Sequence, residues 1–255
     1  MTWDAPTLPG LRFVRERPCP YLPGRVERTL AAPLPPLRAV EVLDTACRAG
    51  FRRSQNYVYR PACRGCAACV PVRVVVNEFS WRRSWRRILN ANANLHGEVR
   101  PSRASEEAFD LFHRYQVSRH GGNGMGAMTF SDFRAMLEDS PAPASLIEHR
   151  DGSGRLIAAL LADHVADGWS AVYSFFEPDA PKHSLGSYII LDLIRRTAAE
   201  GRTFVYLGYW IADSPKMAYK ARFAPVEVMD PDGWRRIAPV SSAPIIPLNR
   251  TAHTG

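Results

Sequence analysis

SLIEHRDGSGRLIAALLADHVADGWSAVYSFF, residues 145–176, is the stretch that decides the fold. It contains three segments rich in Leu, Ile, Val and aromatic residues, at 145–149, 155–165 and 169–176. Asp151-Gly152 and Asp167-Gly168 separate these segments, and Asp-Gly pairs favour tight hairpin turns because both residues tolerate positive φ. The stretch therefore predicts three consecutive antiparallel strands.

The residues that follow predict an alternation of helices and strands. Periodicity and turn residues indicate a helix at 185–200, a strand at 203–210, a short helix at 215–221 and a hairpin turn at 230–233. Three antiparallel strands, a helix, a strand, a helix and a last strand is the order of the GNAT acyltransferase fold. We expect an α+β protein with a GNAT-like acyltransferase domain over residues 101–255.

Upstream, the sequence predicts a smaller α/β domain over residues 1–100, which carries most of the cysteines. A helix fits 37–49 and ends at Gly50, and strands at 51–59 and 70–76 flank the cysteines. A basic helix follows through Trp81 and Trp85. Gly97 and Pro101 then interrupt the pattern, which favours a domain boundary near residue 100.

Composition limits the class of protein. The chain has 255 residues, of which 46 % are hydrophobic and 23 % charged, as in ordinary globular proteins. It has no uncharged apolar run of membrane-spanning length, and its first residues lack the basic and apolar segments of a secretory signal. These features predict a cytoplasmic protein with no membrane partner.

Positive charge is concentrated in one part of the chain. The net charge is +8, with 33 Lys and Arg, and residues 48–103 contain 12 Arg against two acidic residues. Such a block is expected to bind a polyanion, although a solvated basic face would read the same way. For contacts with a nucleic acid, the candidate residues are those of the basic helix: Arg82, Arg83, Arg86 and Arg87.

Four of the five cysteines form a candidate metal site. Cys63, Cys66 and Cys69 have metal-ligand spacing, and Cys19 is a possible fourth ligand from upstream. Thiolates at this spacing suit zinc or a [4Fe–4S] cluster, and a set of reduced thiols without metal is the alternative.

Several long motifs resemble the arginyl-tRNA–protein transferase family. Cys19-Pro20-Tyr21-Leu22-Pro23, Gly50-Phe51-Arg52-Arg53-Ser54 and Tyr59-Arg60-Pro61 before Cys63 are similar to its N-terminal domain. The segments 184–188, 206–211 and 215–227 resemble its C-terminal domain. The resemblance covers about residues 10–230, and the 255-residue length suits the compact bacterial branch.

That branch moves leucine from leucyl-tRNA to proteins that begin with Asp or Glu, which marks them for degradation under the N-end rule. The resemblance implies the same aminoacyltransferase activity here. Because the ester of charged tRNA is already activated, the reaction requires no cofactor, although arginyl relatives have been linked to cysteine-bound iron–sulfur. Alternatives are arginyl transfer by the same mechanism, a non-catalytic RNA-binding protein and a small-molecule acetyltransferase. The absence of a glycine-rich coenzyme A loop near Ser184 disfavours the last.

The acidic residue of the acceptor protein needs a cationic pocket. Arginine suits it because its planar fork binds a carboxylate through two hydrogen bonds. The candidates lie together in the N-terminal motif: Arg52, Arg53, Ser54 and Tyr57. Contacts of these arginines with phosphate are the alternative.

The C-terminal motifs supply candidates for catalysis and for binding the tRNA end. Lys220 is expected to contact the tRNA end or to polarise the ester carbonyl, with Tyr219 beside it and Asp213 orienting the incoming amine. Asp213 and Ser184 are alternatively plain helix N-caps. For the tRNA end, the candidates are backbone N–H groups at a helix start and two aromatic residues: Ser184, Gly186, Tyr209 and Trp210.

Overall fold

The computed structural model describes residues 8–14, 16–120, 124–180 and 183–237. An eight-stranded sheet has the order β14-β13-β7-β12-β11-β10-β9-β8, and a four-stranded sheet has the order β1-β4-β6-β5. The strands are β1 (Arg12–Phe13), β2 (Arg17–Pro18), β3 (Val26–Glu27), β4 (Thr29–Pro33), β5 (Arg52–Ser54), β6 (Tyr57–Pro61), β7 (Val70–Val75), β8 (His96–Pro101), β9 (Ala144–Arg150), β10 (Leu156–Val165), β11 (Gly168–Phe176), β12 (Phe204–Trp210), β13 (Val226–Asp230) and β14 (Gly233–Arg236). The α-helices are α1 (Ala39–Arg48), α2 (Arg83–Ala91), α3 (Glu106–His120), α4 (Phe130–Glu138) and α5 (Leu185–Ala199), and the 3₁₀-helices include η1 (Pro36–Arg38), η2 (Val76–Glu78), η3 (Gly124–Ala127) and η5 (Ala218–Phe223).

The quoted stretch forms the three predicted strands. β9, β10 and β11 pair antiparallel, with Leu160 of β10 opposite Ile147 on one side and Ser174 on the other. After α5 the chain returns as β12, which pairs parallel with β11. The order expected for a GNAT-like fold is confirmed, and the chain is of the α+β class.

The large sheet divides between β11 and β12. Their pairing covers only Gly168–Ser170 against Phe204–Tyr206, although β11 continues to Phe176 and β12 to Trp210. At the closed end Gly168 has no room for a side chain, because a Cβ would lie 1.7 Å from the Phe204 carbonyl oxygen. Beyond the pairing the strands separate, and both present main-chain groups to the opening.

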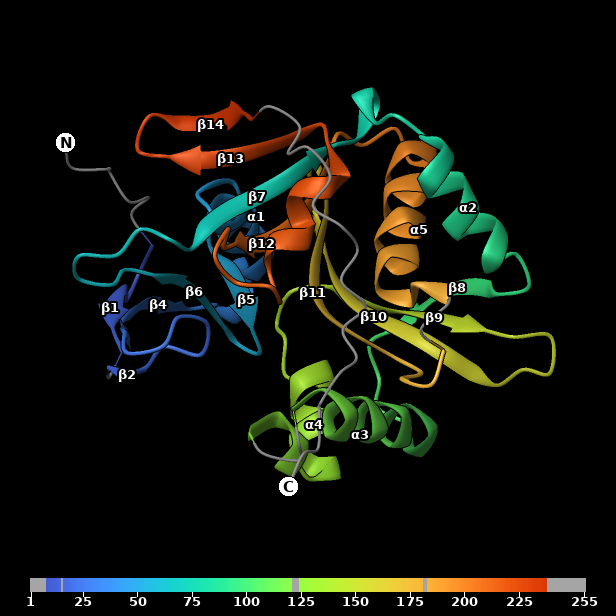
Figure 1. Ribbon diagram of the computed structural model, residues 1–255. Coiled ribbons are helices and arrows are strands. Elements are labelled where there is room, and N and C mark those ends of the chain that lie inside the picture. Colours follow the sequence, from blue (N-terminus) through green and yellow to red (C-terminus); the bar gives the residue numbers. More distant parts are fainter. Residues whose placement is uncertain (1–7, 15, 121–123, 181–182, 238–255) are drawn as a thin grey trace, which may run out of the picture.

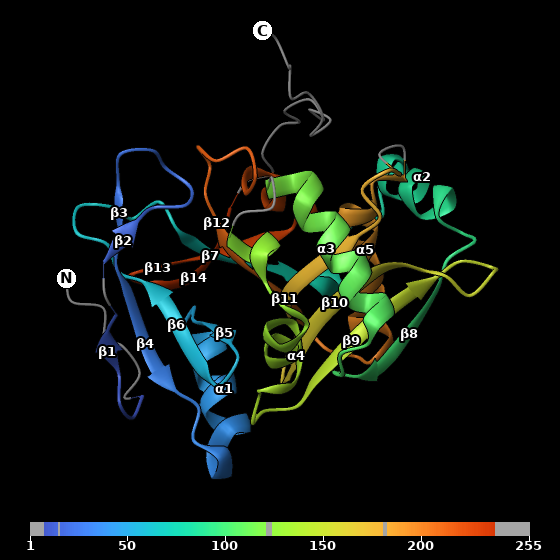
Figure 2. The same ribbon diagram turned by 90° about the horizontal axis from the view of Figure 1, so that it is seen from below.

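Helices cover both faces of the large sheet. α3 and α4 lie on one face, and α5 with α2 lies on the other (Figure 1, Figure 2). The face below α5 holds the largest apolar cluster, which includes Val74, Trp85, Leu191 and Val205. The opposite face packs the aromatic residues of α3 and α4 against Phe175.

The N-terminal region follows the prediction only in part. Helix 37–49 is confirmed as η1 and α1, but the single strand expected at 51–59 is wrong, because Gln55 adopts a positive φ of 50° and folds the segment into the hairpin β5–β6. Gly97 and Pro101, which were expected to interrupt the pattern at a domain boundary, both lie in the edge strand β8. β7 and β8 both belong to the large sheet, so the proposed boundary at residue 100 lies between segments that share one sheet.

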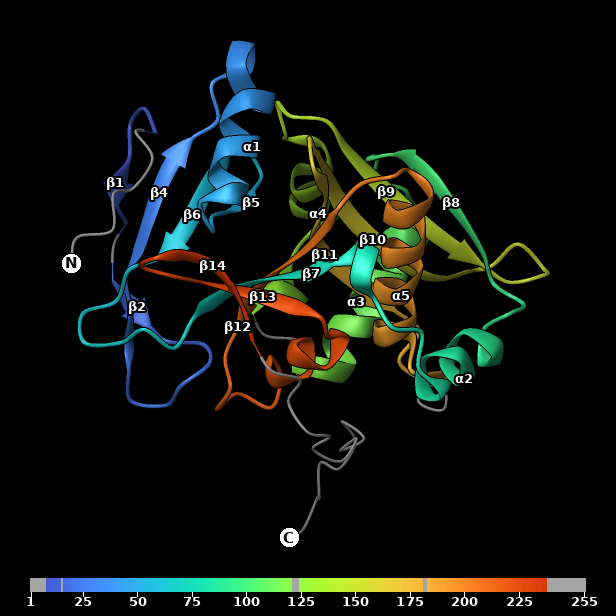
Figure 3. The same ribbon diagram turned by 90° about the horizontal axis from the view of Figure 1, so that it is seen from above.

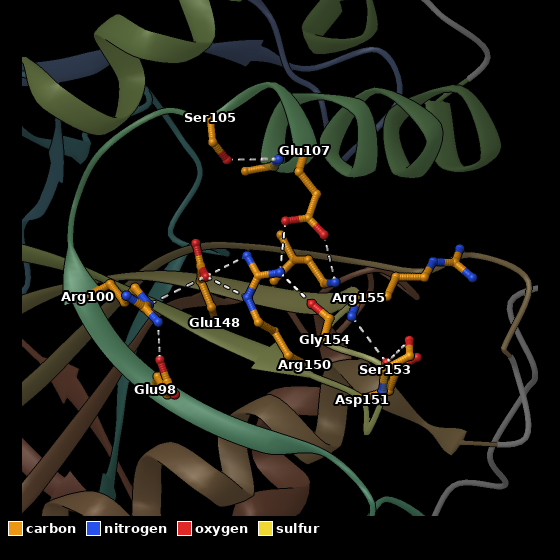
Figure 4. A network of polar contacts seen from close by, with 12 residues as sticks. Glu98, Arg100, Ser105, Glu107, Glu148, Arg150, Asp151, Ser153, Gly154 and Arg155 are labelled. Carbon is orange, nitrogen blue, oxygen red and sulfur yellow. Dashed lines mark hydrogen bonds and ion pairs between the residues drawn. The ribbon is translucent and has the colours of Figure 1, made fainter.

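A polar network fastens the start of α3 to the sheet (Figure 4). Glu107 accepts a hydrogen bond from the Leu156 amide at 3.0 Å and pairs with Arg150 at 2.8 Å. Ser105 caps the helix by accepting from the Ala108 amide at 3.2 Å, as its position predicts. Arg150 also donates to Glu148 at 2.9 Å. The network fixes the direction in which α3 runs toward the sheet opening.

Within the described ranges, no helix has both the length and the apolar character that crossing a bilayer requires.

Candidate active site at the divided sheet

Arg52 lies where the two halves of the large sheet separate. Its side chain is buried, and Nη2 donates to the carbonyl oxygens of Ala171 and, at 3.2 Å, Val172 on β11. On the β12 side, Gly208 has a φ of +77°, and a Cβ there would lie 2.9 Å from Arg52 Nε. Nη1 is buried without a hydrogen-bond partner among the described residues. The opening therefore holds a buried cation with one uncommitted donor.

Lys220 reaches the same place from η5. Its Nζ donates to the Tyr209 carbonyl oxygen at 2.7 Å, and the residue is only 8 % exposed. Burial, with a smaller contribution from the nearby Arg52 guanidinium, lowers the pKa of Lys220 to about 7. The amine is therefore close to half protonated near neutral pH, which an exposed lysine is not.

Tyrosines surround the two cations. Tyr59 packs against Tyr209 with ring centroids 6.1 Å apart. Burial raises the pKa of Tyr21 to about 12, which the Arg52 guanidinium partly opposes. The Tyr173 hydroxyl accepts a hydrogen bond from Gln116 of α3 at 2.6 Å. Burial raises the pKa of Tyr59 and Tyr209 as well, so these hydroxyls stay protonated at neutral pH.

Arg53 has a different position from its neighbour. Its Nε donates to Asp163 Oδ1 at 2.7 Å, and both side chains are completely buried. This ion pair already neutralises Arg53, so the structure does not present it to an acceptor carboxylate as expected. Ser54 is half-buried at the end of β5, and Tyr57 is exposed at the start of β6. Of the four residues assigned to the acidic pocket, Arg52 alone joins the charged centre.

The C-terminal candidates divide between the core and the surface. Tyr209 is buried, and its hydroxyl lies 2.9 Å from the Tyr59 carbonyl oxygen, to which it donates. Trp210 is half-buried and donates to the Ala218 carbonyl at 3.3 Å. Tyr219 is partly exposed beside Lys220, and its ring meets that of Phe223 edge to face at 6.4 Å. Asp213 lies exposed in a turn and forms no hydrogen bond or ion pair with any described residue.

The basic helix is confirmed as α2, and its arginines face solvent. Arg83, Arg86 and Arg87 are exposed on α2, and Arg82 is exposed at its N-cap. The buried face of the same helix carries Trp85, which stacks on Phe223 of η5 with ring centroids 5.0 Å apart. An exposed cationic surface therefore lies next to the short helix that carries Lys220. Figure 3 shows α2 beside α5 on this face of the sheet.

The start of α5 borders the far side of the opening. Ser184 occupies the N-cap position of α5, as the alternative expected, but it adopts a left-handed conformation with φ 49° and its side chain makes no capping hydrogen bond. Gly186 lies against the Phe176 ring, which a Cβ would approach to 3.2 Å. Arg119 at the end of α3 lies 5.2 Å above the same ring. The amides of this helix start therefore have no competing side-chain acceptor from Ser184.

The cysteines gather near the N-terminal sheet. Cys63, Cys66 and Cys69 line a pocket of about 330 Å³, flanked by Arg60 and Arg235. Burial and the neighbouring thiols, including Cys19, raise the pKa of Cys69 to about 12. The thiols supply suitable ligand atoms, yet no three His, Cys, Asp or Glu side chains in the described ranges are arranged to hold a metal ion. As placed, they do not form a coordination site, and no chemical step runs through them.

Sequence reasoning missed two polar residues on the strands that border the opening. Asp163 directly follows the apolar run 156–162 within one predicted strand, and a charge inside a buried strand is a signal for a partner. Tyr173 shows no such signal, because alternating aromatic residues in a strand usually indicate core packing. Its role depends on Gln116 from a helix that the sequence does not place.

Comparisons with solved structures concern the fold. The chain is similar to the structure of L-PGS from Bacillus licheniformis, with 13 % identity and a TM-score of 0.44 over 56 % of this chain and 47 % of that chain. It is also similar to a GCN5-related glucosamine N-acetyltransferase region of a fungal β-N-acetylglucosaminidase, with 11 % identity and a TM-score of 0.40 over 78 % and 22 % of the two chains.

Comparisons of sequence give the family. The family model described as "Arginine-tRNA-protein transferase, N terminus" matches residues 17–87, and the model of the C terminus of the same family matches residues 107–230. The aspartate/glutamate leucyltransferase of Paramagnetospirillum magneticum is 50 % identical over 89 % of this chain and 93 % of its own. That of Granulibacter bethesdensis is 47 % identical over 93 % and 91 %. The chain therefore belongs to the arginine-tRNA–protein transferase family and, within it, to the aspartate/glutamate leucyltransferases, which are aminoacyltransferases.

Proposed function

We propose that this enzyme transfers leucine from leucyl-tRNA to the α-amino group of proteins that begin with Asp or Glu, which directs those proteins to degradation. The observation that carries the proposal is the pair of buried cations, Arg52 and Lys220, at the opening of an acyltransferase-like sheet. The names of relatives at 47–50 % identity support the leucyl donor and the acidic acceptor.

The reaction forms an amide bond and breaks the ester to the terminal ribose. The acceptor nitrogen loses a proton, and the departing ribose oxygen gains one. Lys220 suits this transfer because a pKa of about 7 lets its amine accept and donate a proton near neutral pH. One N–H is used by the Tyr209 carbonyl, so in the neutral form the lone pair and a second N–H remain for the reacting groups.

Arg52 acts on charge. Its guanidinium attracts the carboxylate of an N-terminal Asp or Glu and favours the unprotonated form of the adjacent α-amine. The same cation stabilises negative charge that develops on the ester oxygen. The uncommitted Nη1 is the donor for these interactions.

The exposed arginines of α2 and the start of α5 bind the tRNA. Arg82, Arg83, Arg86 and Arg87 supply positive charge for phosphates, next to the helix that carries Lys220. The amides at Ser184 and Gly186 suit a phosphate close to the 3′ end. Tyr219 supplies a partly exposed ring on which a base can stack.

One assay tests the proposal. Purified enzyme is mixed with radiolabelled leucyl-tRNA or arginyl-tRNA and with peptides that begin with Asp, Glu, Asn or Gln. We expect leucine on the Asp and Glu peptides, and little on the Asn and Gln peptides, which have similar shape without the charge. If only arginine is transferred, the donor is arginyl-tRNA and the proposed leucyl donor is wrong. RNA binding without transfer from either tRNA would contradict the enzymatic function.

We also propose that Cys19, Cys63, Cys66 and Cys69 bind zinc or an iron–sulfur cluster after a local rearrangement, because the four thiols lie close enough to influence one another's charge. Metal analysis and absorbance spectroscopy of anaerobically purified protein test this. If the protein transfers leucine without bound zinc or iron, the four cysteines are reduced thiols that hold no metal.

A further inference from the structure

A buried ion pair between Arg53 and Asp163 connects β5 of the N-terminal sheet to β10 of the large sheet. It joins residues 110 positions apart, at 2.7 Å, with neither side chain exposed. A buried salt bridge is a weak source of stability, because the cost of removing two charges from water offsets most of their attraction. An apolar pair of similar size would stabilise such a site equally well. The retained charges therefore call for another explanation.

The pair lies at the apex of the sheet opening. Asp163 of β10 is opposite Ser170 of β11, and Ser170 is the last β11 residue that pairs with β12. The carboxylate thus stands where the two halves of the sheet begin to separate. Arg53 brings β5 of the N-terminal sheet to this point, and its Nη1 also donates to the Gln55 carbonyl at 3.1 Å.

Arg52 is the next residue on the same strand. With Arg53 fixed by Asp163, the Arg52 side chain enters the opening and donates to the carbonyl oxygens of Ala171 and Val172. Two adjacent arginines therefore hold β5 at two points, one by a carboxylate and one by main-chain carbonyls. A shift of β5 would move the Arg52 guanidinium away from Lys220.

We propose that the Arg53–Asp163 ion pair is a positioning device for leucyl transfer: it locks β5 to the apex of the sheet and thereby sets where the Arg52 guanidinium stands relative to the Lys220 amine. This inference rests on the proposed function of Arg52 and Lys220. Neither Arg53 nor Asp163 touches a substrate, and both act through Arg52.

Arg52 is the charged group that acts on both Asp163 and Lys220. Asp163 faces Arg53, Arg52 and His164, and the thiol of Cys47 lies nearby. Lys220 faces Arg52, with Cys69 as the opposing group. Because Arg52 is shared by both sets, its displacement is the route by which loss of the ion pair reaches Lys220.

The test replaces the pair by apolar residues of similar volume, Arg53→Met with Asp163→Leu, in the full-length chain. We expect a melting temperature within a few degrees of wild type, since such replacements are often neutral or stabilising. We expect kcat to fall by about 10- to 100-fold and KM for the acceptor peptide to rise, because the reacting groups are misplaced. KM for leucyl-tRNA stays unchanged.

A second readout does not depend on activity. The chain has only three lysines, so mass spectrometry can follow the reaction of each one with an amine reagent. The extent of labelling of Lys220 is measured relative to that of exposed Lys216. In the double variant Arg52 no longer stands beside Lys220, so we expect the pH midpoint for labelling of Lys220 to move upward. The acid limb of the pH–rate profile moves in the same direction. This labelling result holds even if the transferred amino acid is not leucine.

The matched control replaces another Arg–carboxylate pair of the same sheet, Arg73→Met with Glu227→Leu, which is largely buried at 2.7 Å on β7 and β13. Its kinetics and its Lys220 labelling are expected to equal those of wild type. If the first double variant fails to fold, Arg53→Lys, which keeps the charge and loses the planar fork, is expected to show smaller changes in the same directions. A folded variant of either kind with wild-type kcat, pH profile and Lys220 labelling would overturn the proposal.

Discussion

Two cationic regions of this enzyme carry charge of the same sign in opposite surroundings. At the sheet opening, Arg52 and Lys220 are buried and held by main-chain carbonyl oxygens. On α2, the side chains of Arg83, Arg86 and Arg87 face solvent. Main-chain carbonyls hold the cations of the first region in place, whereas those of the second are surrounded by water.

The difference separates catalysis from attraction. In a buried site a neighbouring charge acts at low dielectric, so it shifts the pKa of Lys220 and acts on reacting atoms. Exposed arginines are screened by salt within about 10 Å, and they raise the affinity and association rate of a polyanion. Substitutions in the two regions are therefore expected to affect different kinetic constants.

The largest expected effect is that of Arg52→Ala. Removing the cation takes away a charged donor at the reaction centre, for which losses of about 10²- to 10³-fold in kcat are typical. Steady-state kinetics with Asp- and Asn-starting peptides measure it, and the preference for Asp over Asn is expected to shrink. Arg48→Ala, an exposed arginine on α1, is the control. If Arg52→Ala has wild-type activity, Arg52 has no role in the reaction.

A smaller effect is expected when Arg82, Arg83, Arg86 and Arg87 are all replaced by Gln. KM for leucyl-tRNA is expected to rise about tenfold at low salt with kcat preserved. The negative slope of log affinity against log salt concentration is expected to become shallower by up to about 3–4, because each lost phosphate contact releases about one counterion fewer on binding. The control removes the same charge from exposed sites elsewhere, at Arg12, Arg25, Arg48 and Arg134. Equal effects of the two variants would mean that net charge alone, and not α2, attracts the tRNA.

The smallest expected effect is on stability. The pKa of Lys220 is about 7 in the folded chain, below the usual lysine value of about 10.4, so the unfolded chain binds more protons between these values. The contribution of Lys220 to the free energy of unfolding is therefore most unfavourable below pH 7. It becomes less unfavourable as pH rises, by at most about 1.4 kcal/mol per pH unit. Urea unfolding of wild type and Lys220→Met at pH 7, 8 and 9 measures this slope.

The stability advantage of Lys220→Met over wild type is expected to shrink as pH rises. Lys216→Met, at an exposed position, serves as the control and is expected to follow the wild-type curve. Parallel curves for wild type and Lys220→Met would mean that Lys220 titrates as an ordinary lysine.

Local patterns were sufficient for much of the fold. The Asp-Gly turns and apolar runs of residues 145–176 predicted β9–β11, and the 3.6-residue periodicity predicted α5. The turn at Gln55 was missed because neither Gln55 nor Asn56 is Gly or Pro, and the positive φ arises from pairing of β5 with β6. β7 was expected to bury one face and buries both, because Val72 and Val74 pack into the cluster beneath α5 while Arg73 on the other face packs against the Phe204 and Trp234 rings.

The site was less predictable than the fold. Motifs singled out Arg52 and Arg53 together, yet one reaches the sheet opening and the other is neutralised by Asp163. The two are adjacent and chemically identical, so no local signal separates them. Their different roles follow from what β10 and β11 place opposite each side chain.

The sequence by itself determined the order of strands and helices along residues 144–236, the amphipathic basic helix and, through its motifs, the family. These depend on periodicity, turn chemistry and charge within short segments. Only the tertiary structure decided that Arg52 and Lys220 meet, that the α2 arginines stay exposed, and that the pKa of Lys220 falls to about 7. Burial and the distance between charges set those properties, and both depend on residues more than 100 positions apart in the chain.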